Sequence, residues 1–397
     1  MKNGTIMFLV KLVSKKRNYF SIGRDYSNNL SIVVHSDTLF SAICNNFRKL
    51  YGKIELEKFL KEIRQHETEK SRLRISSSFH YIDVYKNNKI TDTIFFVPRP
   101  LIRFPFTAEA QDYLDKNPKI FKKIDFISLE VANKLKENKQ IDFSQYHILG
   151  RRYLVANEDL KKLGLDQFLS LLKDSNLNLE KIERIIRNKI SIYEILDEQK
   201  VRIDRKTHES EPFMWSKLKL LISSYYLNEV ERIDYKLVPG YYFIFDSSQL
   251  SPEINSKLRA SITFIIDEGI GGRRSSGCGL VDDVEFIKLD NSFPYFDLFD
   301  SKDAGMFMNL SLVHPKLEDM KDIKFFNIFG RSGYIYSFET TSERFNDIKF
   351  IEEGSLFEKK VRGSFIQVAS DEFISKHHEV FKNGIGFYLN LGILEVE

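Results

Sequence analysis

Residues 269–279 read Gly-Ile-Gly-Gly-Arg-Arg-Ser-Ser-Gly-Cys-Gly, between a helix predicted over 253–267 and a strand predicted over 280–287. Five glycines in eleven residues allow positive φ angles and let another molecule approach backbone N–H groups. The two arginines and two serines add donors that suit phosphate oxygens. Composition alone leaves two interpretations open, a phosphate-binding loop or a long turn whose arginines face water.

The composition indicates a globular protein with a local rather than a general affinity for nucleic acid. The length of 397 residues is enough for two or three domains. The hydrophobic content of 42% supplies a sizeable core and argues against a largely disordered chain. The net charge of only +4 means that any nucleic-acid surface must be a local patch. The 34 Phe and 18 Tyr fit β-rich cores and include possible stacking platforms for bases.

The two cysteines, Cys44 and Cys278, argue against several other classes of protein. They lie far apart and form no Cys-x-x-Cys spacing, which disfavours a zinc site and a disulfide framework. The apolar run over residues 5–10 is too short for a signal peptide or a membrane helix. We therefore expect a soluble, cytoplasmic protein that binds no membrane, cofactor or metal.

The N-terminal part predicts a strand over residues 5–13 and an amphipathic helix over 36–51. Ser36 or Asp37 can cap this helix, and Gly52 can end it in a left-handed conformation. The N–H groups at the helix N-terminus predict an anion site. His35 precedes the helix as a possible catalytic base, although a histidine in this place is more often structural or a binding contact.

A β segment over residues 72–97 ends in Pro98-Arg99-Pro100. The two prolines exclude helix there and hold Arg99 on a stiff extended piece, which suits a binding rim but also an ordinary surface loop. Residues 108–200 then read as charged helices, predicted over 124–136, 157–172 and 179–186, which we interpret as an insertion.

Residues 201–208 read Val-Arg-Ile-Asp-Arg-Lys-Thr-His and predict an exposed hairpin or extended loop. Basic side chains spaced along such a segment can follow a phosphate backbone. Asp204 is predicted to orient an arginine through a bidentate pair.

The order of elements predicts an α+β protein. From residue 238 a strand, a helix, the glycine-rich loop and a further strand repeat the strand-then-helix opening of the chain. We predict two tandem ferredoxin-like (RRM-like) domains. Residues 1–237 form the first, with a helical insertion at about 108–200 and a basic protrusion at about 200–210; residues 238–397 form the second and carry the glycine-rich loop 269–279.

Five short motifs, in order along the chain, resemble the repeat-associated (RAMP) superfamily of CRISPR proteins. Within it, the chain is most similar to the subunits that hold the 5′ handle of the guide RNA (crRNA) in type III-A (Csm) effector complexes. The motifs are His-Ser-Asp-Thr-Leu-Phe at 35–40, Phe-Val-Pro-Arg-Pro at 96–100, Arg-Ile-Asp-Arg-Lys-Thr at 202–207, the loop from 269 to 277 and Glu-Gly-Ser at 353–355. Residues 108–200 match none of them.

The resemblance implies a non-catalytic, RNA-binding subunit for antiviral defence. Such a subunit would cap the crRNA 5′ handle, dock the large polymerase-like subunit, adjoin a backbone RAMP subunit and meet target RNA through the complex. The residues implied to contact RNA are His35, Ser36, Thr38, Arg99, Arg202, Arg205, Lys206, Gly271, Gly272, Arg273, Arg274, Ser275, Ser276 and Gly277.

Two enzyme classes are alternatives. Relatives in the same superfamily cleave precursor crRNA, and His35 or His80 could act in such an endoribonuclease as a general acid or base. A nucleotide-phosphate enzyme is disfavoured, because the glycine-rich loop lacks the Gly-Lys-Ser/Thr ending and follows a helix instead of opening one.

Overall fold

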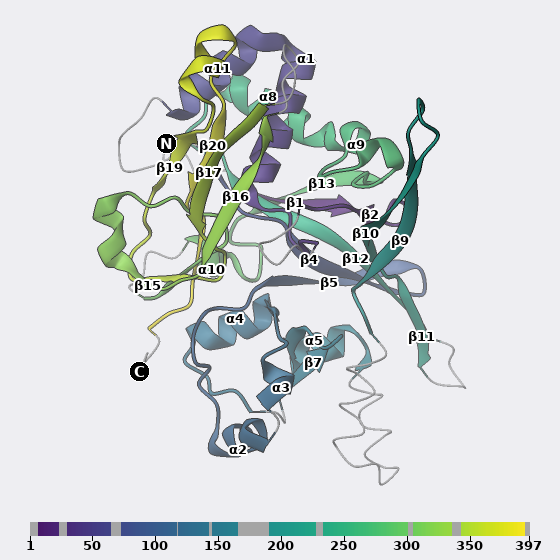
Figure 1. Ribbon diagram of the computed structural model, residues 1–397. Coiled ribbons are helices and arrows are strands. Elements are labelled where there is room, and N and C mark those ends of the chain that lie inside the picture. Colours follow the sequence, from purple (N-terminus) through teal and green to yellow (C-terminus); the bar gives the residue numbers. More distant parts are fainter. Residues whose placement is uncertain are drawn as a thin grey trace.

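The computed structural model describes residues 7–23, 30–64, 73–116, 118–142, 145–165, 190–227, 233–300, 305–335 and 343–393. Figure 1 shows a large central sheet with helices on both sides, a long hairpin at one edge and a C-terminal part at the other. The mixed α+β class predicted from the sequence is confirmed. Within the described residues, no helix is both long enough and apolar enough to cross a membrane.

The large sheet is antiparallel through its central strands. Their order across the sheet is β13-β1-β12-β4-β5, with bounds β1 (Met7–Val13), β4 (Phe79–Lys86), β5 (Lys89–Pro98), β12 (Ile233–Asp246) and β13 (Asp283–Leu289). Two short strands, β3 (Arg74–Ile75) and β11 (Ser223–Leu227), also pair with β12. Strand β1 is buried along almost its whole length because strands cover both its edges and helices cover its face.

Helices α1 (Ser36–Arg64), α8 (Pro252–Thr263) and α9 (Ile265–Glu268) lie on one side of this sheet (Figure 1). In α1 the predicted apolar face is buried through Leu39, Phe40, Ile43 and Phe47. Gly52 has φ 84° and interrupts the helix, as predicted, but a second helical stretch continues to Arg64. It continues because Phe59 and Ile63 add to the same core.

The predicted domain boundary between residues 237 and 238 falls inside β12, which is a correction to the sequence interpretation. β12 lies between β1 and β4, in register from Met7 opposite Asp246 and from Phe79 opposite Tyr242. The two strands that were predicted to open a second domain, β12 and β13, therefore belong to the large sheet, and the helix between them, α8, packs on it. The boundary was misplaced because strand pairing over long sequence separation leaves no local signal.

Residues 108–165 form a segment that extends the large sheet below β5 in Figure 1. Its elements are α2 (Ala108–Lys116), α3 (Pro118–Phe121), β6 (Phe126–Ser128), α4 (Leu129–Lys136), β7 (Tyr146–Leu149), β8 (Tyr153–Ala156) and α5 (Asn157–Lys162). The helix predicted over 124–136 begins only at Leu129, because Phe126 and Ile127 are buried in β6. The helix predicted over 179–186 and the end of that over 157–172 lie outside the described residues.

The C-terminal part contains a small antiparallel sheet and two hairpins. Its elements are α10 (Phe296–Asp300), β14 (Phe307–Asn309), the 3-10 helix η2 (Leu317–Asp322), β15 (Ile323–Phe325), β16 (Ile328–Ile335), β17 (Glu343–Ile351), β18 (Leu356–Phe357), β19 (Gly363–Gln367), α11 (Asp371–Lys376), β20 (Phe381–Ile385) and β21 (Tyr388–Asn390). The sheet order is β21-β14-β18-β15. Counted along the chain, these strands are the fourth, first, third and second, and β13-β1-β12-β4 of the large sheet follow the same order.

Candidate nucleic-acid interface

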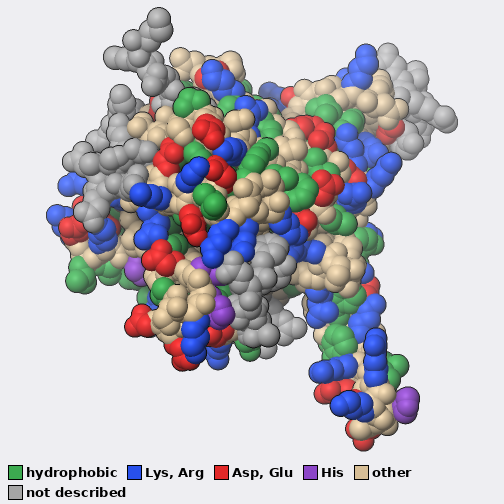
Figure 2. All heavy atoms as spheres, turned by 90° about the horizontal axis from the view of Figure 1, so that it is seen from above, with side chains coloured by type: hydrophobic (Ala, Val, Ile, Leu, Met, Phe, Trp, Pro, Cys, Tyr) green, Lys and Arg blue, Asp and Glu red, His purple; other side chains and the backbone are tan. Residues whose placement is uncertain are grey.

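The predicted basic protrusion is the tip of a long exposed hairpin, which confirms the hairpin interpretation. Strands β9 (Tyr193–Ile203) and β10 (Ser210–Leu220) pair along eleven residues each, so the hairpin is longer than the predicted 200–210. Figure 2 shows it as an arm that leaves the body and carries Lys and Arg side chains over much of its length. At its root, Leu218 and Lys219 pair with strand β2 (Tyr19–Phe20).

Asp204 organises the turn at the tip of this hairpin. Its carboxylate accepts hydrogen bonds from the backbone N–H groups of Thr207 (3.0 Å) and Lys206 (2.7 Å), which lower its pKa. The predicted pairing of Asp204 with an arginine is therefore wrong. Arg202, Arg205 and Lys206 are exposed, and within the described part of the chain none of these three side chains forms an ion pair.

The two faces of the hairpin differ in chemistry, because successive side chains of a strand point to opposite sides. One face carries aromatic rings and cations, including Phe213, Trp215, Lys200 and Lys217, and Glu198 on the same face pairs with Lys200 at 3.0 Å and with Lys217 at 2.5 Å. The other face is apolar toward the tip, where Val201, Ile203 and Met214 are 55%, 63% and 58% exposed. The hairpin bears as many acidic as basic side chains. Any attraction for RNA therefore depends on the arrangement of charges and not on net charge.

The glycine-rich loop meets the cationic face of the hairpin through Arg273. The Arg273 guanidinium lies 4.9 Å from the ring centroid of Trp215 and 6.0 Å from that of Phe213. The ammonium groups of Lys200 and Lys217 lie 4.8 and 5.5 Å from the Trp215 ring. Two segments that are far apart in the sequence thus form one surface, on which Arg273 and Phe213 are exposed and Trp215 is buried beneath the cations.

The backbone of the loop packs against residues 19–22 rather than standing open. The N–H groups of Gly272 and Gly279 donate to the carbonyls of Ser21 and Tyr19, both at 2.7 Å. The prediction that the Gly272 N–H would hold a phosphate is therefore wrong. At Gly271, with φ 85°, an added Cβ would lie 2.7 Å from the Ser21 carbonyl oxygen, so this close approach requires glycine.

The exposed part of the loop consists of Gly272, Arg273, Ser275, Ser276 and Gly277. The neighbouring Arg274 is engaged within the fold. Its guanidinium donates to the Glu268 carbonyl at 3.2 Å and lies 3.6 Å from the Glu268 carboxylate. The two arginines, equivalent in the sequence interpretation, therefore differ, and only Arg273 belongs to the surface shared with the hairpin.

The predicted anion site at the N-terminus of α1 is covered by the C-terminal part of the chain, so this prediction is wrong. His35 is buried, and its Nδ1 lies 2.9 Å from the carboxylate of Glu353, which also accepts a hydrogen bond from Ser77. The buried Ser36 hydroxyl accepts from the Leu312 N–H at 3.0 Å. Burial alone would raise the pKa of Glu353, but His35 and Ser77 lower it.

Asp37 and Thr38 belong to the same contact between the two parts. Arg331 donates two hydrogen bonds to the Asp37 carboxylate, at 2.8 and 2.9 Å, and one to the Thr38 hydroxyl. Lys382 adds a second cation 3.3 Å from Asp37. Burial would raise the pKa of Asp37, but the charges of Arg331 and Lys382 lower it well below its usual range. In this structure, the 35–40 motif joins the N- and C-terminal parts.

Arg99 is also engaged within the protein. Its guanidinium donates to the Phe121 carbonyl at 3.0 Å and lies 4.5 Å from the Phe121 ring centroid. Burial lowers its pKa. On the backbone side, Gly354 of the 353–355 motif approaches the Arg99 carbonyl so closely that an added Cβ would lie 2.6 Å away. Arg99 thus contacts Phe121 within the protein, and its place on a binding rim stays a prediction.

His80, the second histidine considered for catalysis, is sealed in an aromatic cluster. Its side chain is fully buried, and its Nδ1 lies 3.0 Å from the Tyr153 hydroxyl. Its ring is stacked on Tyr193, with centroids 5.5 Å apart. Burial lowers the pKa of His80 to about 3. A substrate phosphate has no access to this imidazole.

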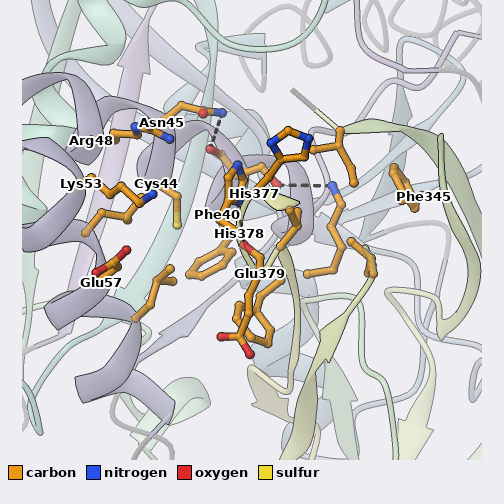
Figure 3. A pocket seen from close by; sticks show the side chains of 18 of the residues that line it. Phe40, Cys44, Asn45, Arg48, Lys53, Glu57, Phe345, His377, His378 and Glu379 are labelled. Carbon is orange, nitrogen blue, oxygen red and sulfur yellow. Dashed lines mark hydrogen bonds between the residues drawn. The ribbon is translucent and has the colours of Figure 1, made fainter. Parts of the chain in front are cut away.

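A separate hollow of about 740 Å³ lies between α1 and the C-terminal part. Figure 3 shows Phe40 and Phe345 among the side chains that point into it, with Arg48, Lys53 and Glu57 along the α1 side. Other cations lining it are already paired, Arg64 with Glu379 at 3.0 Å and Lys382 with Asp37. We interpret the hollow as part of the seam between the two parts and not as a track for RNA.

The sequence analysis missed the aromatic side chains of the interface, Phe213 and Trp215. Trp215 is the single tryptophan of the chain and lies in an alternating stretch, Phe-Met-Trp-Ser-Lys-Leu-Lys over 213–219. This alternation of rings and lysines was the available signal. The contact of Trp215 with Arg273 had no such signal in the sequence, because 57 residues separate the two along the chain.

Two protein-family profiles match this chain, one over its N-terminal part and the other over its C-terminal part. The profile of the RAMP superfamily matches residues 22–282, well over half of the sequence. The chain belongs to the RAMP superfamily. The resemblance drawn from the five motifs is thus confirmed. The profile of the CRISPR Csm4 C-terminal domain matches residues 302–391, which hold the small sheet and the two hairpins of this RAMP protein.

Individual relatives agree with this assignment. The chain is 28% identical over 377 residues to the CRISPR system protein Csm4 of Methanocaldococcus jannaschii, covering 92% of this chain and 88% of the relative. Its fold resembles a chain in the crystal structure of the Csm3–Csm4 subcomplex of a type III-A CRISPR–Cas interference complex, with TM-score 0.61, 23% identity and coverage of 96% and 99%. A chain of a Csm1–Csm4 cassette with bound cA4 gives TM-score 0.52, 16% identity and coverage of 98% and 99%.

Proposed function

We propose that this protein is the RNA-binding subunit of a type III-A CRISPR (Csm) effector complex that caps the 5′ handle of the crRNA, without catalytic activity of its own. One observation carries the proposal: the exposed arginine of the glycine-rich loop, Arg273, packs on the buried hairpin ring of Trp215 and so joins the loop and the hairpin in one surface. Membership of the RAMP superfamily and similarity to Csm4 of M. jannaschii support the same assignment.

The chemistry of the surface suits a single-stranded handle. Arg202, Arg205 and Lys206 at the hairpin tip would contact backbone phosphates, while Ser275 and Ser276 of the loop would add hydroxyl donors. The Phe213 ring, which is 39% exposed, would stack on a base, while the buried Trp215 ring would hold Arg273 in place. Unpaired base edges would carry the sequence information. His35, Ser36, Thr38, Arg99 and Gly272 would act indirectly, by holding the parts of the protein together.

The partners would be the other subunits of the complex. The solved structures of similar fold contain Csm4 with Csm3 and Csm4 with Csm1, which supports docking to a backbone RAMP subunit and to the large polymerase-like subunit. The apolar hairpin face of Val201, Ile203 and Met214 is suited to a protein neighbour. Target RNA would be met through the complex, in the cytoplasm and without a cofactor or metal of this subunit.

The finer fold proposed is a pair of ferredoxin-like units. The shared strand order of the large and the small sheet supports it. The boundary between the units would then lie after β13 and not at residue 238, which places the glycine-rich loop on the first unit.

The test is a competition for the purified protein between RNA with the repeat-derived 5′ handle and RNA with a scrambled handle. It is run at moderate salt, and the bound RNA is examined on a denaturing gel. We expect preferential binding of the handle and RNA of unchanged length. Shortened RNA would contradict the non-catalytic assignment and favour a RAMP endoribonuclease, with His35 the first residue to replace. Equal binding of both RNAs would contradict handle recognition.

A further inference from the structure

A basic hollow of about 640 Å³ lies beside the root of the hairpin, at the opposite edge from the glycine-rich loop. The three-stranded sheet at the root has the order β2-β10-β9. The loop packs on the β2 edge through the hydrogen bond from Gly279 to Tyr19. The hollow reaches the β9 edge through Ser191, which is two residues before the start of β9.

The turn between β7 and β8 is shaped to meet this root. Gly150 and Arg151 both have positive φ, 55° and 67°. A Cβ at Gly150 would lie 2.7 Å from the Ile190 carbonyl oxygen, so only glycine allows the turn to pack against the segment that leads into β9. The Arg152 carbonyl accepts from the N–H groups of Asp125 and Phe126, at 2.9 and 3.1 Å, which fixes the turn beside the segment carrying Lys122 and Lys123.

The lining of the hollow is cationic and polar. It carries four basic side chains, Lys122, Lys123, Arg151 and Arg152, and one carboxylate, Asp125. Asp125 pairs with Arg152, whose guanidinium lies 6.0 Å from the ring centroid of Tyr193 at the start of β9. Lys122 and Lys123 are exposed, and neither forms an ion pair with any residue that the structure describes.

These features favour a phosphate group over a protein segment. A protein partner is usually anchored by apolar or aromatic contacts, whereas every residue lining this hollow is charged, polar or glycine. The Ser191 hydroxyl already donates to the Tyr193 carbonyl at 2.9 Å, so the lysine ammonium groups would supply the donors. An ammonium group is a point charge with rotatable donors and suits the non-bridging oxygens of a backbone phosphate.

We propose that this hollow holds backbone phosphates of the same RNA strand that contacts Arg273, so that the strand is gripped on both sides of the hairpin root. The inference rests on the proposed RNA-binding function and adds a second contact to it. The hairpin would then separate two electrostatic sites, the loop on its β2 edge and the hollow on its β9 edge.

The test compares the full chain with a Lys122→Ala/Lys123→Ala variant in binding to RNA that carries the handle followed by guide sequence, over a series of salt concentrations. The matched control is Lys116→Ala/Lys119→Ala, which removes the same charge from exposed positions of the same insertion. Losing two phosphate contacts should lower the slope of log affinity against log salt by about 1.4, and affinity at 0.1 M salt by roughly tenfold. The control pair should change both quantities much less.

A third variant, Arg273→Ala, separates this proposal from the one it rests on. Since the two sites are on different edges, combining Arg273→Ala with Lys122→Ala/Lys123→Ala should add the two losses of slope. If Arg273→Ala weakens binding and the lysine variant does not, or if the lysine variant equals its control, the hollow is not an RNA site and the proposed function stands. If the unaltered chain does not bind RNA at all, the proposed function itself fails.

Discussion

His80 shows how a residue that looks catalytic in the sequence can be part of the core. The sequence places it on a strand near polar residues, but β-sheet and insertion together enclose it with Tyr153, Tyr193 and Tyr241. The cost of charging a buried imidazole keeps it neutral, with a pKa of about 3. Its role is therefore structural, and it gives the protein a measurable sensitivity to acid.

Replacing His80 with Phe should flatten the dependence of stability on pH. Below a pH of about 6.5, unfolded His80 binds a proton that the folded protein excludes, so stability falls as pH drops toward 3. This histidine can contribute up to about 1.4 kcal/mol per pH unit in that interval. Urea unfolding between pH 4 and 7 should show a slope shallower by about that amount in His80→Phe.

The control for this measurement is His208→Gln, at an exposed position of the hairpin tip. It removes one histidine at a position outside the core and so controls for the loss of a histidine as such. Identical slopes for His80→Phe and the unaltered protein would contradict the assignment of His80 as a neutral core residue.

At this scale the sequence predicted exposed basic residues better than paired ones. Arg202, Arg205 and Lys206 were assigned to a protruding segment because alternation and turn residues are local signals. The partners of Arg274 and Arg99, the carbonyls of Glu268 and Phe121, could not be predicted because they are fixed only by the fold.

At the scale of elements, the glycine-rich loop is held by two kinds of glycine. Gly279 has φ 78°, and an added Cβ would lie 1.9 Å from the Ile270 carbonyl oxygen. Gly277 has a similar φ of 82°, but no atom lies within 4 Å of its added Cβ. Gly279 is thus required both for its left-handed φ and because a side chain would collide with Ile270. Gly277 is required for its left-handed φ alone.

Gly279→Ala should therefore destabilise the protein more than its matched control Gly277→Ala. Each substitution places alanine at a left-handed φ, which should lower the free energy of unfolding by about 1 kcal/mol. Only Gly279→Ala also pushes the loop away from the Ile270 backbone, so its total loss should be roughly 3 kcal/mol or more. Denaturant unfolding at neutral pH measures the difference. Equal losses of stability would show that the loop is not packed as described.

Elements that pair locally were predictable and those that pair over distance were not. The tip of the hairpin at 201–208 and the strand pair of β4 and β5 were predicted from alternation and turns, whereas residues 193–200 of β9 had been assigned to the helical region. Strand β6 was taken for the start of a helix, because Phe126 and Ile127 are apolar at a spacing that both structures allow. Only pairing with β5 decides between them.

At the scale of the whole molecule, the family motifs mark the seam and the interface separately. The motif at 35–40 and the Glu-Gly-Ser at 353–355 meet through the ion pair of His35 with Glu353. The motif at 202–207 and the loop at 269–277 lie on the two sides of the exposed face. Sequence order alone could not tell binding motifs from those that join the two parts, since both are polar and rich in turn residues.

The chain offers its own probe of the central claim, because Trp215 is its single tryptophan and lies at the centre of the proposed RNA surface. The ring is only 8% exposed, so RNA that binds Arg273 or displaces it would change the surroundings of the ring and therefore its fluorescence. The fluorescence should therefore change on titration with handle RNA and saturate with the affinity found by an independent binding assay. The Trp215→Phe variant supplies the blank.

The titration is repeated with Arg273→Ala, which should shift the fluorescence curve to higher RNA concentration and lower its salt slope by about 0.7. RNA that binds with unchanged affinity in Arg273→Ala, while the fluorescence of Trp215 in the unaltered protein stays constant, would contradict the account and place the RNA elsewhere on the molecule.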